Sequence, residues 1–229
     1  MAANRALLHR FVATVAGSPV ILMGNSMGGM ISLLEAAAAP ESVAGLVLID
    51  PALPFVPARP DPGVTALFAA YATPGLNRIL MARRARMTPE QAVLATLRLC
   101  CVDVSRIPPG VVAQHVRLAE RRTEFTDVSR DFVRSARSVV ATAGYVNGAP
   151  YRRGIRSLDA PVLLVHGAKD RLVPVAAARV AARVNPSWTT VIMPDVGHVP
   201  QLEAAPETAA TVLTWLDGPG RDAAKAASR

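Results

Sequence analysis

Short apolar runs alternate along the chain with segments whose apolar residues recur every three or four positions. The runs cover residues 19–23, 45–49, 160–165 and 188–193. Continuous runs of this kind are typical of strands that are covered on both faces. Helical spacing is found over residues 1–17, 30–39, 174–184 and 206–216. Strands separated by helices predict an α/β fold built on a parallel sheet.

The pattern changes between the second and third runs, where residues 54–157 show helical spacing and no strand. We expect helices near 64–72, 76–85, 89–101, 109–122 and 126–147. Thr88 followed by Pro89 is a typical helix start, with the threonine as cap. The chain is therefore divided into a first sheet part at 1–53, a helical insertion at 54–157, a second sheet part at 158–217 and a flexible tail at 218–229.

Composition adds limits on the class of protein. The 229 residues suit one domain with an insertion, and 51% of them are hydrophobic, enough for a sizeable core. The net charge is +8, but the arginines are scattered, few aromatic residues accompany them, and motifs that read bases are absent. We expect no nucleic-acid partner and interpret the charge as a solvated basic surface.

Two further features bear on the compartment. The N-terminal segment is interrupted by His9 and Arg10, and nowhere do about 18 apolar residues run together, so we expect neither a secretion signal nor a membrane span. Cys100 and Cys101 are adjacent and cannot form an ordinary structural disulfide with each other. A cytoplasmic location is the resulting prediction.

A five-residue pattern follows the first run. Gly24-Asn25-Ser26-Met27-Gly28 has the form Gly-x-Ser-x-Gly, and helix-forming residues come directly after it. A serine at the apex of a sharp strand-to-helix turn is strained, and flanking glycines let the strand and the helix approach each other. Its hydroxyl then lies at the positive end of the helix. Here the chain resembles the serine hydrolases of the α/β-hydrolase superfamily.

The resemblance extends to the loops after the last two runs. A serine nucleophile needs a base and an acid that orients the base, and in this family the chain order is serine, acid, histidine. His166-Gly167-Ala168-Lys169-Asp170 follows the third run, and Gly197-His198 follows the fourth, with Glu203 five residues later. Parallel strands end at one edge of a sheet. We therefore predict Ser26 as nucleophile, Asp170 as acid and His198 as base.

Alternatives remain for the acid and the base. Asp50 also ends a strand on the same side and is the reserve acid, whereas His166 is a weaker candidate for the base because it more naturally packs at the strand end. His9 and His115 fall in helices. We expect Asp195 to shape its loop and Glu203 to support it without a catalytic role.

One departure from the family's pattern concerns the beginning of the chain. In α/β-hydrolases several strands precede the elbow strand, and a loop among them donates a second N–H to the oxyanion hole. Only one helix precedes Val20 here, so the Met27 N–H is the one donor that can be assigned. A start placed too late in the reading frame is the favoured explanation, and a genuine short form the other. The sheet edge along 19–23 would then be unpaired and could support self-association.

The resemblance implies an activity and a substrate class. We expect an N-terminally truncated α/β-hydrolase-type sheet with an inserted helical cap, which cleaves a carboxylic ester or thioester of a small apolar substrate through an acyl-enzyme, with no metal or organic cofactor. A C–C bond hydrolase, a haloperoxidase or an acyltransferase could use the same triad. A non-catalytic scaffold that binds a ligand or partner is the alternative from another class.

Overall fold

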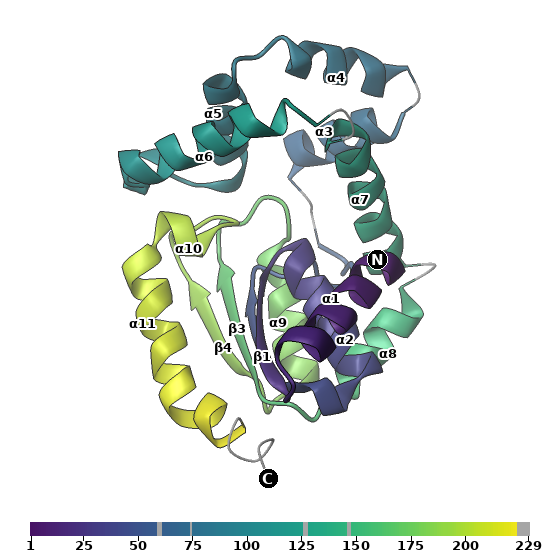
Figure 1. The fold of residues 1–229 in the computed structure, drawn as a ribbon, viewed down its shortest axis with the longest axis vertical. Coiled ribbons are helices and arrows are strands. Elements are labelled where there is room, and N and C mark those ends of the chain that lie inside the picture. Colours follow the sequence, from purple (N-terminus) through teal and green to yellow (C-terminus); the bar gives the residue numbers. More distant parts are fainter. Residues whose placement is uncertain (59–60, 74, 126–127, 146–147, 224–229) are drawn as a thin grey trace.

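Four parallel strands lie side by side in the order in which the chain forms them (Figure 1). In the computed structural model, which describes residues 1–58, 61–73, 75–125, 128–145 and 148–223, these are β1 (Val20–Asn25), β2 (Val43–Ile49), β3 (Val162–Gly167) and β4 (Thr189–Met193). Leu46 of β2 is paired with Leu22 of β1 and with Val162 of β3. The predicted parallel sheet is confirmed, with strand ends shifted by at most two residues.

The two central strands carry the core on both of their faces. Every residue of β2 and β3 is buried, as the uninterrupted apolar runs predict. Alternate residues point to opposite faces. Leu48 and Leu164 belong to one apolar cluster, whereas Val47 and Leu163 belong to a second. The sheet therefore requires a helical layer on each side.

Helices supply both layers. α2 (Met27–Ala38), α8 (Ala149–Arg156) and α9 (Val175–Val184) bury residues in the first cluster, and α11 (Ala205–Trp215) buries Val212 and Trp215 in the second. α1 (Ala2–Val15) packs on α2 (Figure 1). Only Val12 of α1 is buried, and Leu7, Phe11 and Val15 form an exposed apolar stripe. Helical spacing thus predicted α1, but much of its apolar side faces solvent.

Among the described residues, the insertion between β2 and β3 consists of helices and the loops that join them, with no strand. It contains α3 (Pro62–Ala72), α4 (Leu76–Ala85), α5 (Pro89–Cys100), α6 (Pro109–Arg122) and α7 (Val128–Ala143), followed by α8. Figure 1 shows α3 to α6 beyond the sheet edge at which the strands end, and α7 leading back toward α8. Thr88 caps α5 as predicted, because Gln91 N donates to Thr88 Oγ1 at 3.2 Å.

Some expectations differ from the structure. α8 was not predicted from the pattern. Leu216–Gly220 continue in a helical turn, and Gly220 packs on Trp215; the flexibility of the tail from 218 stays a prediction. Residues 126–127, 146–147 and 224–229, on which parts of the predicted seventh helix and tail fall, lie outside the described residues.

β1 forms one edge of the described sheet. It pairs with β2 alone among the described strands, and Met23 is 55% exposed. This is the apolar edge predicted at residues 19–23; self-association through it stays a prediction. No helix in the described part of the chain combines the length and apolar character that crossing a membrane requires.

Candidate active site

Ser26 occupies a strained turn between β1 and α2. Its φ and ψ are 54° and −117°, a conformation that non-glycine residues rarely adopt and that costs about 1–3 kcal/mol. A Cβ on Gly24 would lie 2.5 Å from the carbonyl carbon of Gly28, and one on Gly29 would lie 2.7 Å from Pro51 Cβ. Glycine is therefore required at positions 24 and 29. The expected steric need for glycine at position 28 is wrong, because a Cβ there meets nothing within 4 Å.

Backbone hydrogen bonds hold the strained serine in place. Ser26 N donates to Ile49 O at 3.0 Å, and Ser26 O accepts from Ala52 N at 2.9 Å and from Met30 N at 3.1 Å. Met27 is the first residue of α2. The first N–H groups of a helix have no acceptor within it and can receive an anion. The Met27 N–H thus has the position that the oxyanion prediction requires.

Asp170 and His198 are hydrogen-bonded to each other. Asp170 is buried in the loop after β3, and its Oδ2 accepts from His198 Nδ1 at 2.7 Å. Asp170 Oδ1 accepts from Leu172 N at 2.7 Å and from Val173 N at 3.0 Å. Burial alone would raise the pKa of Asp170, but the hydrogen bond from His198, the electrostatic interaction with it and the hydrogen bond from Val173 N together outweigh burial, so that the pKa is lowered. Asp170 is thus held as a carboxylate.

The loops that carry these two residues lie in close backbone contact with each other and with the end of α5. Lys169 N donates to Val196 O at 3.0 Å, and His198 N donates to Cys100 O at 2.6 Å. A Cβ on Gly167 would lie 2.0 Å from Gly197 O. Glycine at position 167 is therefore required for the approach of the histidine loop, and glycine at position 197 for the approach of the end of α5. The contact with Cys100 was not predictable from the motif.

Asn25 connects the serine turn to the histidine. Its Nδ2 donates to Ile49 O and to His198 O, each at 3.0 Å. The hydrogen-bonded chain nevertheless stops short of the serine, because no bond to Ser26 Oγ is found in the described part of the molecule. The structure thus brings Asp170 and His198 into contact and places Ser26 next to a residue that bonds His198. Asn25 was missed from the sequence because its position in the motif accepts any residue.

Glu203 joins the histidine loop to the insertion. This carboxylate, at the end of α10 (Pro200–Glu203), is buried, and its Oε2 accepts from Gly197 N at 2.8 Å. Its Oε1 accepts from Val102 N and Asp103 N, each at 2.8 Å. Glu203 therefore supports the loop as expected, and it also holds the segment after α5.

The alternative residues occupy distinct places. Asp50 is fully buried at the end of β2, with φ 40°, and burial together with the charge of Asp170 raises its pKa to about 9. His166 is buried at the end of β3, where burial lowers its pKa and Nε2 lies 3.0 Å from Val173 O. His9 lies in α1 and is 2.7 Å from Glu35, and His115 lies in α6 near Val111 O.

Hydrogen bonding and protonation bear on two other kinds of chemistry at the site, metal binding and attack by a thiol. Asp50, His166 and Asp170 each offer one ligand atom within 4.8 Å of the others, a spacing that a small cation could use. The Asp170 oxygens, however, already accept three hydrogen bonds. Burial, and then the charge of Asp170, raises the pKa of Cys100 to about 11. This thiol is protonated at neutral pH and is a poor nucleophile.

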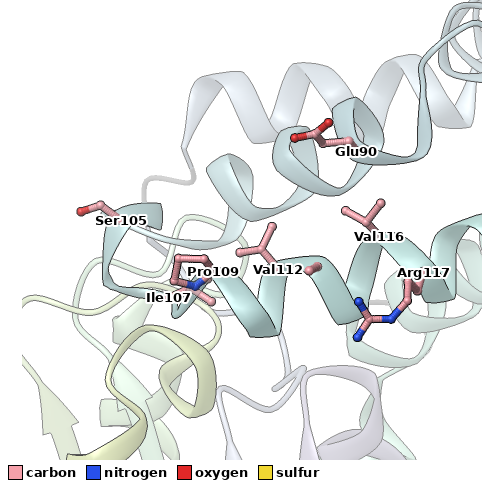
Figure 2. A pocket seen from close by; sticks show the side chains of 8 residues that line it. Glu90, Ser105, Ile107, Pro109, Val112, Val116 and Arg117 are labelled. Carbon is pink, nitrogen blue, oxygen red and sulfur yellow. The ribbon is translucent and has the colours of Figure 1, made fainter.

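A groove of about 750 Å³ lies between α5 and α6 (Figure 2). Val112 and Val116 of α6 point into it, with Ile107 and Pro109 at one end and Glu90 on the α5 side. Ile107 and Val112 also belong to an apolar cluster that includes Val199, the residue after His198. The groove therefore adjoins the cluster that packs against the histidine loop.

Comparison with known proteins places the chain in a family. The sequence profile of the alpha/beta hydrolase family matches residues 2–211. Monoglyceride lipase of Homo sapiens is 29% identical over 156 residues, which are 68% of this chain and 43% of the lipase. Pimeloyl-acyl-carrier-protein methyl ester esterase of Xanthomonas oryzae pv. oryzae is 27% identical over 216 residues, which are 90% of this chain and 74% of the esterase.

The structural comparison agrees. A bacterial membrane phospholipase A has a TM-score of 0.69 and 26% identity, over 95% of this chain and 63% of that chain. The chain spans about half the length of several curated relatives that it matches. Fold, sequence profile and structural neighbours agree that the chain belongs to the α/β-hydrolase family.

Proposed function

We propose that the protein hydrolyses an ester-like bond by a serine mechanism, with Ser26 as nucleophile, His198 as general base and Asp170 as orienting acid. The observation that carries the proposal is the 2.7 Å bond from His198 Nδ1 to a buried Asp170 carboxylate. A carboxylate on Nδ1 fixes the ring tautomer and leaves Nε2 as the base. Asn25 joins this histidine to the serine turn.

The first half of the reaction forms an acyl-enzyme. His198 Nε2 takes the proton of Ser26 Oγ as the oxygen attacks the substrate carbonyl carbon, and Asp170 stabilises the imidazolium that results. The Met27 N–H, at the start of α2, donates to the oxyanion. The imidazolium then protonates the leaving alkoxide or thiolate, and the C–O or C–S bond breaks.

Water completes the cycle. His198 Nε2 takes a proton from a water molecule that attacks the acyl carbon, and the second tetrahedral intermediate collapses with return of the proton to Ser26 Oγ. The acid product leaves, and the serine is regenerated.

The substrate is proposed to be a small carboxylic ester or thioester with an apolar acyl group. Relatives named as a monoglyceride lipase and as an acyl-carrier-protein methyl ester esterase support ester chemistry. Five of the eight residues that line the groove between α5 and α6 are apolar, which supports an apolar substrate. Helices α3 to α7 serve, in this proposal, as a cap over the edge where the strands end.

Labelling with a fluorophosphonate tests the nucleophile. The folded protein is expected to form one adduct, found by peptide mass spectrometry on Ser26, and Ser26→Ala is expected to abolish it. Ser157→Ala is the matched control, because Ser157 is an exposed serine whose hydroxyl bonds Gly154 O. An unlabelled wild-type protein with a cooperative unfolding transition, or equal labelling of Ser26→Ala, would overturn the assignment.

A further inference from the structure

Two carboxyl groups with unequal hydrogen bonding lie together behind His198. Asp50 and Asp170 come from the ends of neighbouring strands, and both side chains are wholly buried. Asp50, His166 and Asp170 have ligand atoms within 4.8 Å of one another. Two negative charges at such a separation in a buried site repel strongly, and sharing one proton relieves the repulsion. The question is which group holds the proton.

The donors around the two groups answer it. Asp170 receives three hydrogen bonds, from Leu172 N, Val173 N and His198 Nδ1. Asp50 receives one, from Gly167 N to Oδ1 at 2.9 Å, and its Oδ2 has no donor among the described residues. A buried carboxylate needs donors on both oxygens, whereas a carboxylic acid needs an acceptor for its own O–H. The arrangement suits a charged Asp170 and a neutral Asp50.

His166 completes the set without supplying a charge. Its Nε2 lies 3.0 Å from the carbonyl of Val173, so Nε2 carries the proton and donates it there. Nδ1 is then a lone pair, 3.5 Å from Asp50 Oδ1 and without a hydrogen-bond donor among the described residues. Burial keeps the pKa of His166 low, and a neutral imidazole cannot offset a charged Asp50.

We infer that Asp50 is a neutral carboxylic acid whose O–H donates to the Asp170 carboxylate, and that it is a positioning residue of the proposed triad. The inference rests on the proposed function for its catalytic part. The O–H gives Asp170 a fourth donor and fixes the carboxylate that orients His198. In this role Asp50 does not replace Asp170 as the triad acid; it holds the Asp170 carboxylate in position.

The neighbouring titratable groups influence the pKa of Asp50. Asp170 and His166 face Asp50 from β3 and the loop after it, and the charge of Glu203 acts on it from α10; His198 and Cys100 interact with Asp170. Burial and then the charge of Asp170 raise the pKa of Asp50 to about 9, in agreement with the hydrogen-bond pattern. The unfolded chain would lose this proton near pH 4.

Infrared spectroscopy of the whole protein tests the proton directly. At pH 7 the wild type is expected to show a buried protonated-carboxyl band that disappears on titration toward pH 9, and Asp50→Asn is expected to lack it. Asp159→Asn, at an exposed position before β3, is the control and should keep the band. A wild type without the band at pH 7 would overturn the inference even if no variant folds.

Unfolding at several pH values gives a second test that needs no activity. Between about pH 4 and pH 9 the native state holds one proton that the unfolded chain has released, so stability falls as pH rises. Asp50→Asn should remove this slope, a change of about tenfold per pH unit in the unfolding equilibrium constant relative to wild type. Parallel pH profiles for the two proteins would contradict a proton on Asp50.

Rescue by the conservative variant tests the positioning role. Asp50→Ala leaves Asp170 without its fourth donor and is expected to lower kcat about 10- to 100-fold, because small misplacements of catalytic groups have effects of that size. Asp50→Asn, whose amide can donate in place of the O–H, should recover most of the loss. Equal losses in both variants would refute positioning by hydrogen bond. If Ser26 proves unreactive, the infrared and unfolding results still decide the protonation state.

Discussion

The central strands of the sheet and the inserted helices α4 to α6 differ in how many of their residues are buried. All residues of β2 and β3 are buried, and the loops after β1, β3 and β4 approach so closely that only glycine fits at positions 24, 167 and 197. α4 and α6, described over their full lengths, contain no buried residue, and α5 contains one, Leu97. The proposed catalytic groups thus belong to the dense part, where backbone contacts fix them.

The two parts meet where α7 and α8 bury Ala143, Tyr151 and Ile155 in the first apolar cluster, and again at the histidine loop and the acid loop. The Cys100 carbonyl accepts from His198 N, the Glu203 carboxylate holds Val102 and Asp103, and Arg171 pairs with Asp61 at the start of α3. A thinly packed region is easier to move than a dense one. Because the insertion is also attached at the loops that position the proposed acid and base, movement of its helices and the geometry of these two residues are linked.

The largest expected effect comes from the centre of the dense part. Asp170→Asn should lower kcat about 10⁴-fold, equivalent to ~5.5 kcal/mol, because an amide favours the wrong tautomer of His198. Ester hydrolysis measured at pH 7 checks this, with the exposed Asp159→Asn as control. An Asp170→Asn protein that retains a tenth of the wild-type rate would remove Asp170 from the mechanism.

Gly24→Ala should produce the largest loss of stability. The added Cβ would lie 2.5 Å from the backbone of Gly28, so strand and helix must separate, and we expect a loss of about 2–4 kcal/mol. Gly28→Ala is the matched control from the same motif. Space is open there, and alanine suits a helix better than glycine, so its stability should be unchanged or up to ~1 kcal/mol higher. Chemical denaturation measures both; equal losses would show that the turn is not limited by this contact.

Glu203→Gln tests the attachment between the two parts. One end of the glutamine side chain would present N–H groups to a backbone N–H, so at least one of the three bonds is lost, at about 1–3 kcal/mol. Because Gly197 precedes His198, kcat should fall as well. Glu207→Gln, at an exposed position in α11, is the control. A stability loss without any change in kcat would indicate that the attachment does not reach the histidine.

The pattern of apolar residues and the short motifs predicted the elements whose structure depends mainly on residues near them in the sequence. Uninterrupted apolar runs identified β2 and β3, because both faces of those strands are covered, and the serine turn and the loops with Asp170 and His198 follow from strand ends. The contact between Asp170 and His198 agrees with the expected order of residues; their catalytic roles stay predictions.

Contacts between distant segments could not be predicted in this way. Glu203 bonds an N–H that lies 101 positions away, and Asp50 contacts Gly167 across 117 positions. α8 escaped prediction because it is short and buries only Tyr151 and Ile155; its close packing of Gly154 on Ala37 stabilises it. The motif also named Gly28, which the fold does not require for space. In each case the partner, not the local sequence, decides the outcome.

The smallest expected effect comes from the exposed ion pair between Arg106 of the insertion and Asp195 of the histidine loop. Arg106 and Lys169 both bond Asp195, and these bonds, from Lys169 first and then Arg106, lower the pKa of Asp195 to about 2. Arg106→Gln should change stability and kcat little at pH 7, since exposed ion pairs contribute little.

The effect of this variant should appear on acidification. The pairs contribute their stability above about pH 4, the usual range of an aspartate, and in the wild type lose it as pH falls through about 2. Without Arg106 the pKa of Asp195 moves toward its usual value, so the loss should be smaller and should be complete at a higher pH. Denaturation profiles from pH 5 to pH 2 measure this shift, with Arg117→Gln, an exposed arginine of α6, as control. A large loss of stability at pH 7 would mean that Arg106, whose guanidinium also lies 3.8 Å from Glu203 Oε1, is needed to hold the insertion to the histidine loop.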